Sequence, residues 1–499
     1  MALTSNSKDS STRERPKPTL NKWIFCAIAC LCTIAFVIWT GYFIMLIMLP
    51  VFFDIYITKF VPWGTWKNVK NPALKVVLDW VDAILFALVA VYFINTFFFQ
   101  NYQIPSSSLE KSLLVGDFLC VSKLSYGARS PMTPLALPLM QHTIPWLDTK
   151  SYFDKPQLDY KRFGSGKVER NDIVVFNYPS GDSVITKFQN ADYYHIKLQV
   201  GRDEIVNNPN RYGELIYRPV DRRENYVKRC VGLPGDTIEF IDDVTYINGE
   251  AQHIPENRQL KYVVQTNGMP IPPAMFDQLE ISEDDRVYRS MEYPSASVQD
   301  SLILMQAGLK MNDGKDVLLY SNVFLTQDKV DLLSKQPYVL KIVTQNEFYN
   351  NTKTKRDMIG NAVYPMEFYA DKSVRFGDFP ALWIPKRGET IKFDTNVDYK
   401  VAAYERCIKN YEFNDFEYKD GKVYINGQEA SEYTFKLDYY FMAGDNRDNS
   451  ADSRTWGFVP EDHIVGSPLF IWLSLDKDKG WFDGKIRWSR LFTSGNKNK

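Results

Sequence analysis

The sequence predicts a mainly β protein with strongly bent sheets, preceded by two transmembrane helices. Two long uncharged runs near the N-terminus indicate the helices. Beyond Asn101, short segments rich in Val, Ile, Phe and Tyr end at Gly, Asn, Asp or Pro, as strands do. The dipeptides at 248–249 and 426–427 are Asn-Gly, which is typical of hairpin turns. The 499 residues, 45% of them hydrophobic, suffice for more than one domain.

The first uncharged run extends from Trp23 to Phe53. It is longer than the apolar core of a secretory signal peptide and exceeds the ~20 residues that span a bilayer. We therefore expect a transmembrane helix over 23–53, which Pro50 ends or kinks. The second run, Ala83 to Phe99, predicts another span over 76–100, with a helix lying in the membrane interface as the alternative.

The flanking charges leave the topology open. We expect residues 1–22, with five basic residues, to form a flexible polar tail, and the loop 54–75 holds four lysines. The positive-inside rule favours the cytoplasmic side for both segments. Two spans, however, would place the tail beside the C-terminal part, and only the loop would be cytoplasmic.

The soluble part divides into three regions by pattern. Residues 101–251 and 385–499 hold the clearest strand patterns, and 252–384 looks like an inserted subdomain of unassigned role. Segments 170–251 and 387–430 also resemble each other weakly, with Lys228 aligned to Glu405. They are either a degenerate duplication or two unrelated hairpins.

Cysteine and histidine usage indicates no metal site. Cys120, Cys230 and Cys407 are an odd set in the soluble part, so one disulfide could form, but spacing does not pair them. None of the four histidines has metal-ligand spacing, and we interpret His463 as an ordinary surface residue. We expect no metal and no cofactor. The net charge of −1 gives no indication of a nucleic-acid partner.

Three segments carry residues suited to chemistry: "IPSSSLEKSLLVGD" (104–117), "YVKRCVGLPGD" (226–236) and "MAGDNRDNSADSRTWGFVP" (442–460). A serine becomes a nucleophile when a base takes its proton. A lysine can be that base if burial lowers its pKa, and Lys228 lies in an apolar strand pattern. Taken alone, a solvated surface lysine is the commoner case.

The third segment is dense in charges. A calcium-binding EF-hand beginning at Asp445 would need Gly at its sixth position and Glu at its twelfth, where this chain has Ser450 and Trp456. We exclude that interpretation. Four charged residues instead predict a network of charge-assisted hydrogen bonds that fixes a loop: Asp445, Arg447, Asp452 and Arg454.

Together and in this order, the three segments resemble the conserved boxes of bacterial type I signal peptidases. "KRCVGLPGD", "GDNRDNSADSR" with "WGFVP", and "RNDIVVFNYP" carry the resemblance. It covers the second apolar run, residues 101–250 and about 385–493, but not 252–384. It implies a membrane-bound serine endopeptidase with bent antiparallel sheets, which removes signal peptides through an acyl-enzyme intermediate.

The resemblance also implies roles for particular residues. Ser108 would be the nucleophile and Lys228 the general base. The oxyanion would be held by the Ser106 hydroxyl and the backbone N–H of Ser108, and Ser450 would orient the Lys228 amine. Asp445, Arg447, Asp452 and Arg454 would support the site.

The chain departs from the family after the nucleophile. Where the family has Met, a variable residue, Pro and Thr, this chain has Leu109, Glu110, Lys111 and Ser112. Leu109 keeps the apolar bulk. Loss of the proline gives the local backbone more freedom.

For the partners, the resemblance implies preproteins with small residues at positions −1 and −3, bound as an added strand. It implies a multi-pass protein of the bacterial inner membrane, anchored in the lipid bilayer with its catalytic domain on the periplasmic face. With two spans, the tail is then expected outside and the lysine-rich loop inside. The alternative is an inactive membrane-tethered β domain that binds preproteins or assembly partners. A self-cleaving repressor-like peptidase fits less well, because two apolar runs are present and no DNA-binding segment is apparent.

Overall fold

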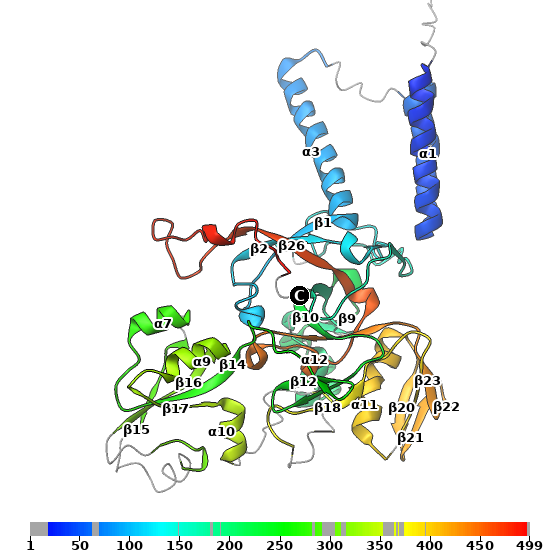
Figure 1. Cartoon of the computed structure of the whole chain (residues 1–499). Coiled ribbons are helices and arrows are strands. Elements are labelled where there is room, and N and C mark those ends of the chain that lie inside the picture. The colour runs from blue at the N-terminus through cyan, green and yellow to red at the C-terminus, as the bar shows by residue number, and fades with distance from the viewer. Residues whose placement is uncertain are drawn as a thin grey trace, which may run out of the picture.

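Two long helices stand above a β-rich body in the computed structural model (Figure 1). The structure describes residues 18–61, 69–147, 149–179, 183–189, 191–281, 285–291, 305–310, 316–352, 364–365, 368, 374–394 and 396–496. The two helices, α1 (Leu20–Thr40) and α3 (Pro72–Phe97), are long and apolar enough to cross a membrane. Asn71 caps α3 by accepting hydrogen bonds from the backbone of Ala73 and Leu74.

The helix predicted over 23–53 ends early, at Thr40. Gly41 follows with φ +75°, a left-handed conformation that glycine adopts without steric cost and that ends helices. The chain then reverses, and the return segment packs back against α1; it comprises η1 (Phe43–Ile47), α2 (Met48–Phe53) and η2 (Asp54–Thr58). The rings of Trp23 and Phe53 lie 6.1 Å apart, so the return segment reaches almost to the start of α1.

This reversal makes α1 and α3 run in the same direction. The ring of Trp39, near the end of α1, lies 5.7 Å from that of Phe97 at the end of α3. Trp39 also lies 5.9 Å from Phe163 of the β-rich body. Both helices therefore begin far from the body and end beside it (Figure 1).

The largest sheet has seven strands in the order β1-β2-β26-β7-β10-β24-β25, and all its neighbours are antiparallel. Irregular registers between β2 and β26, β26 and β7, and β10 and β24 bend it. The prediction of a mainly β fold with bent antiparallel sheets is confirmed. Its strands are β1 (Phe99–Gln103), β2 (Asp117–Ser122), β7 (Ile173–Asn177), β10 (Asn225–Gly232), β24 (Tyr439–Ala443), β25 (Val459–Pro460) and β26 (Ile464–Ser474).

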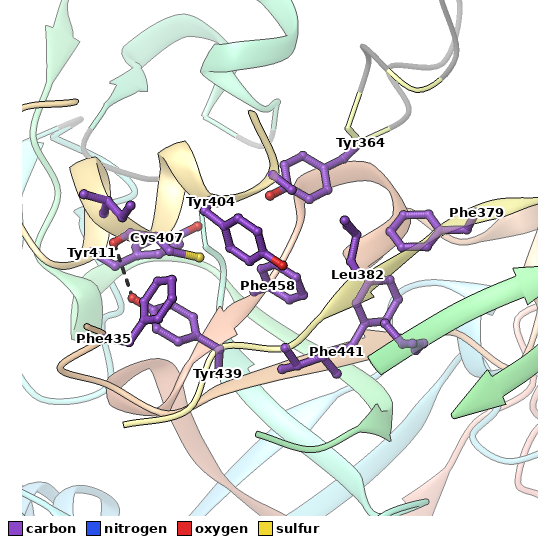
Figure 2. Close-up of a cluster of buried hydrophobic side chains, with 14 of the residues drawn as sticks. Tyr364, Phe379, Leu382, Tyr404, Cys407, Tyr411, Phe435, Tyr439, Phe441 and Phe458 are labelled. Carbon is purple, nitrogen blue, oxygen red and sulfur yellow. Dashed lines mark hydrogen bonds between the residues drawn. The ribbon is translucent and has the colours of Figure 1, made fainter. Parts of the chain in front are cut away.

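A second sheet has the strand order β13-β12-β11-β18. It packs against β24 and helix α11 through a cluster of aromatic side chains (Figure 2). Phe379 and Phe441 lie 5.1 Å apart, and the Tyr439 hydroxyl donates to the carbonyl of Cys407 at 3.3 Å. Cys407 is buried, and all six cysteines are free thiols, so no disulfide forms. The elements are β11 (Thr237–Ile241), β12 (Val244–Ile247), β13 (Glu250–Ala251), β18 (Phe379–Trp383) and α11 (Asp398–Arg406).

The inserted subdomain has a sheet and a core of its own, lined by Val264, Leu279, Tyr320 and Leu333. Since β18 pairs with β11, the chain has rejoined the second sheet by Phe379. The subdomain contains β14 (Leu260–Thr266), α7 (Pro273–Leu279), β15 (Arg289–Met291), β16 (Val317–Leu325), α9 (Gln327–Ser334), β17 (Val339–Thr344) and α10 (Gln345–Asn351).

The two weakly similar segments, 170–251 and 387–430, differ in structure. Lys228 lies on a strand, whereas Glu405 lies in helix α11, so only the hairpins of the two segments correspond.

The described part of the chain also contains short strands and α-helices. The short elements are β3 (Ala128–Arg129), β4 (Thr143–Ile144), β5 (Thr149–Lys150), β6 (Arg162–Phe163), β8 (Val184–Ile185), α4 (Tyr193–Val200), α5 (Arg202–Asn207), α6 (Pro209–Tyr212), β9 (Leu215–Ile216), β19 (Thr390–Lys392), β20 (Phe416–Lys419), β21 (Lys422–Ile425), β22 (Gln428–Glu429), β23 (Glu432–Thr434) and α12 (Ser453–Trp456).

The interpretation of His463 as a surface residue is wrong. Its side chain is buried, with Nε2 3.0 Å from Arg223 Nη1 and Nδ1 2.6 Å from Asp462 Oδ1. Its partner Arg223 lies 240 positions earlier in the chain, so no local pattern indicated that His463 is buried.

Candidate active site

Ser108 and Lys228 meet where the bent sheet brings two distant segments together. Ser108 lies in η4 (Ser107–Leu109), just after β1, and Lys228 lies in the middle of β10, opposite Val174 of β7. Lys228 Nζ donates a hydrogen bond to Ser108 Oγ at 2.7 Å. Only 3% of Lys228 and 7% of Ser108 is exposed, so the pair is shielded from solvent.

The surroundings of Lys228 favour its neutral form. Burial lowers the pKa of its ammonium group to about 8, against the opposing pull of the Asp452 and Asp445 carboxylates. The ring of Tyr226 lies 5.6 Å from Nζ, on the same strand. A lysine with such a pKa is partly neutral near physiological pH and can accept a proton.

The loop between β24 and α12 holds the backbone around Ser108. The N–H of Asn446 donates to the carbonyl of Ser108 at 3.1 Å, and its side-chain amide donates to the carbonyl of Ser107 at 3.3 Å. Asn449 donates to the Ser107 hydroxyl at 3.0 Å. The Ser107 hydroxyl is thus bonded to this loop, whereas the Ser108 hydroxyl faces the lysine.

Gly444 allows this loop to come close. A Cβ at this position would lie 2.6 Å from the Ser108 carbonyl oxygen and 2.3 Å from Ser450 Oγ. Real Cβ atoms do not make such contacts with backbone, so any side chain here would displace the turn that carries Ser108.

Ser106 and Ser450 lie beside the Ser108–Lys228 pair, and their hydroxyls have different partners. Ser106 is exposed, and its Oγ lies 3.4 Å from Ser108 Oγ. Ser450 is half-buried on the loop that contacts Ser108, and its Oγ donates to the carbonyl of Ala451 at 3.5 Å. That bond is long and weak, so the hydroxyl can exchange it for another partner.

A buried ion pair fixes β10 to the same loop. Arg229 donates from Nε and Nη2 to the two oxygens of Asp445, both at 2.7 Å. Ser112 Oγ, from the segment that carries Ser108, donates to the same carboxylate at 2.5 Å. Arg229 is fully buried, so a bidentate, hydrogen-bonded partner is what makes its charge tolerable.

A second ion pair, Asp452–Arg454, stabilises the same loop, because Asp452 also binds Gly444 at the start of the loop. Asp452 accepts from Arg454 Nε and Nη2 at 2.9 and 2.8 Å and from the N–H of Gly444 at 2.9 Å. Arg454 also donates to the carbonyl of Arg447 at 2.6 Å. Arg447 is buried beside the ring of Phe240 and donates to Thr245 Oγ1 at 3.2 Å. Burial, with Arg454 nearby, lowers the pKa of Arg447 to about 10.

The structure therefore brings the candidate residues from the three segments into one site. Sequence reasoning missed Arg229, Ser112, Gly444 and Asn446. Arg229 stands in a quoted motif, next to Lys228, but its partner lies more than 200 residues further along the chain. No local pattern identifies such a pair. Within the described residues, no group of three or more His, Cys, Asp or Glu could hold a metal ion.

Comparison with known proteins agrees with this geometry. The family model described as "Signal peptidase, peptidase S26" matches residues 77–305 and 431–473, which is more than half of the chain. The match extends into the inserted subdomain, beyond the part that the quoted motifs cover.

Curated relatives match most of the chain. Signal peptidase I of Helicobacter pylori is 40% identical over 83% of this chain and 91% of its own length. Signal peptidase I of Haemophilus influenzae is 24% identical over 86% of this chain and 78% of its own. The protein from Buchnera aphidicola (strain Bp) is also 24% identical, over 81% and 79%.

A serine hydroxyl in contact with a buried amine is an arrangement that can activate the serine as a nucleophile. The chain belongs to the signal peptidase family, peptidase S26.

Proposed function

We propose that this protein is a membrane-bound endopeptidase that removes N-terminal signal peptides from preproteins with a Ser108–Lys228 dyad. The observation that carries the proposal is the 2.7 Å contact between Ser108 Oγ and a buried Lys228 whose pKa is lowered to about 8. Relatives named signal peptidase I supply the substrate class.

In the proposed mechanism, neutral Lys228 takes the proton of Ser108 as Oγ attacks the carbonyl carbon of the scissile bond. The Ser106 hydroxyl and the Ser108 N–H stabilise the oxyanion. Protonated Lys228 then gives its proton to the leaving amine, which departs as the mature N-terminus. Lys228 next deprotonates a water molecule, which hydrolyses the ester on Ser108 and releases the signal peptide.

Other members of the site would support these steps. Ser450 would turn its hydroxyl toward Lys228 Nζ and orient it, while Asp445, Arg447, Asp452 and Arg454 hold the loop that contacts Ser108. The substrate would add an extended strand beside the site, with small residues at positions −1 and −3. Anchoring in the bilayer would raise the local concentration of substrates confined to the same plane.

The test is cleavage of a purified preprotein by the full-length protein in detergent. We expect the wild type to cut once, after a small residue, and Ser108→Ala and Lys228→Ala to be inactive. Ser107→Ala is the matched control and should retain activity, because the Ser107 hydroxyl is bonded to Asn449 rather than to the lysine. If the wild type binds preproteins without cutting them, the protein is a binding module instead.

We propose further that the N-terminal tail lies on the cytoplasmic side, opposite the catalytic domain. Because α1 and α3 run in the same direction, their first residues, Leu20 and Pro72, lie at the same end of the helices. The tail precedes Leu20 in the chain, and the loop 54–75 leads to α3. Both segments are basic, so one orientation satisfies the positive-inside rule for both. The catalytic domain then faces the periplasmic side of a bacterial inner membrane.

An epitope tag at the N-terminus tests this topology. In inside-out membrane vesicles, added protease should remove the tag and spare the catalytic domain; in spheroplasts it should do the reverse. Removal of both from spheroplasts would instead support two antiparallel spans, with the tail outside.

A further inference from the structure

The turn after Ser108 has a backbone that its family counterpart cannot adopt. Lys111 stands where the resembled family has proline, and its φ is +72°. Proline is fixed near −65°, so the two residues cannot hold this turn in the same way. A non-glycine residue in the left-handed region is disfavoured unless its surroundings hold it there.

The inserted subdomain supplies such surroundings. Lys111 is only 10% exposed at its side chain, and its Nζ donates to Glu280 Oε2 at 2.7 Å. Glu280 follows helix α7 and is itself left-handed, with φ +54°. Lys329, on α9, donates to the same carboxylate oxygen at 2.6 Å and to the carbonyl of Leu279 at 3.0 Å.

The charge state of Glu280 suits this arrangement. Partial burial raises the pKa of its carboxyl, but hydrogen bonds from Lys111 and Lys329 outweigh that effect and lower it to about 2. The carboxylate is therefore ionised at any pH at which the enzyme would work, and it stays a partner for both lysines.

The first residues of the inserted subdomain contact Ser112 and the loop between β24 and α12. Asn257 donates to Ser112 Oγ at 3.2 Å, next to Lys111. The N–H of Gln259 donates to the carbonyl of Asp445 at 2.8 Å, and the N–H of Arg447 donates to the carbonyl of Gln259 at 3.0 Å. The subdomain thus binds both the nucleophile turn and the loop that holds it.

We infer that the inserted subdomain is a positioning element of the active site, in which Glu280 bridges Lys111 and Lys329 and fixes the turn that carries Ser108. We call Lys111, Glu280 and Lys329 the ion triad. It restrains the backbone of this turn, as proline does elsewhere in the family. The inference rests on the proposed function, because it assumes that Ser108 is the nucleophile. Lys111, Glu280 and Lys329 are positioning residues and touch no reacting atom.

The test compares Glu280→Gln and Lys111→Met with Asp277→Asn in the full-length protein. Asp277 is the matched control: it lies on α7, is exposed like Glu280, and pairs with Arg286 at 2.8 Å, within the subdomain. We expect both triad variants to lower kcat for a preprotein roughly 10-fold, because small displacements of a nucleophile are costly. KM should change less than about twofold. Lys111→Arg, which keeps the ion pair, should restore most of the activity.

Two results would overturn the inference. One is that Glu280→Gln matches Asp277→Asn in kcat. The other is that kcat falls only in step with the melting temperature, which would mean that the triad merely holds the subdomain in place. Neither result bears on the dyad, whose own failure would appear as activity retained by Ser108→Ala.

Discussion

At the scale of single residues, the burial of Lys228 links activity to stability. The pKa of Lys228 is about 8 in the folded protein and ~10.4 in the unfolded chain. At a pH between these two pKa values, folding therefore releases the proton of Lys228. The folded state is therefore penalised fully below pH 8, and the penalty disappears as pH rises to about 10.5. At ~1.36 kcal/mol per pKa unit, it amounts to about 3 kcal/mol.

Replacing Lys228 by Met should remove that penalty. We expect Lys228→Met to be inactive, yet to raise the free energy of unfolding by about 3 kcal/mol at pH 7 and by much less at pH 10.5. Urea unfolding at both pH values measures this. Equal effects at the two pH values would mean that the lysine is not desolvated.

Gly444 gives a second prediction at this scale. The Cβ of Gly444→Ala would lie 2.6 Å from the Ser108 carbonyl oxygen, so the turn must shift. We expect roughly a 10²-fold loss of kcat. Gly480→Ala is the control, since its Cβ would meet only the mobile end of the Asp483 side chain. Normal activity in Gly444→Ala would show that the loop does not position the nucleophile.

At the scale of elements, the Arg229–Asp445 pair joins β10, the loop after β24 and the segment that carries Ser108. Asp445→Asn leaves a fully buried guanidinium without its counter-charge, which should cost roughly 3–5 kcal/mol of stability. Glu429→Gln, which breaks the exposed pair with Lys422, should cost less than about 1 kcal/mol. The free energies of unfolding of the two variants, compared with wild type, check this contrast; similar losses would contradict it.

The elements also show what the sequence could and could not reveal. Short runs of β-branched and aromatic residues that end at turn formers, together with Asn-Gly turns, predicted the β fold because these signals are local. The return segment was missed because residues 43–53 are uncharged, like residues 23–40, so that the run reads as one helix despite Gly41. The contact of Asn446 with Ser108 joins positions more than 300 residues apart, and no spacing rule reaches that far.

At the scale of the whole molecule, the candidate span α3, the seven-stranded sheet and the inserted subdomain all contact or lead to the turn at Ser108. Helix α3 leads directly into β1 and then to Ser108, which lies eleven positions after Phe97, the end of the candidate span (Figure 1). The resemblance to signal peptidases predicted the dyad segments. The resemblance did not predict the contacts of Glu280 and Lys329, because the quoted motifs do not cover the inserted subdomain.

In the proposed mechanism, Ser108 forms an acyl-enzyme with Lys228 as its base. Rapid acid quenching of the enzyme with a preprotein substrate, followed by mass spectrometry of the protein's peptides, would detect this intermediate. We predict that the signal-peptide acyl group is found on the peptide containing Ser108, at that residue, and is absent in Lys228→Ala. An acyl group on Ser106 or Ser107 would exclude Ser108 as the nucleophile, and equal labelling in Lys228→Ala would exclude Lys228 as its base.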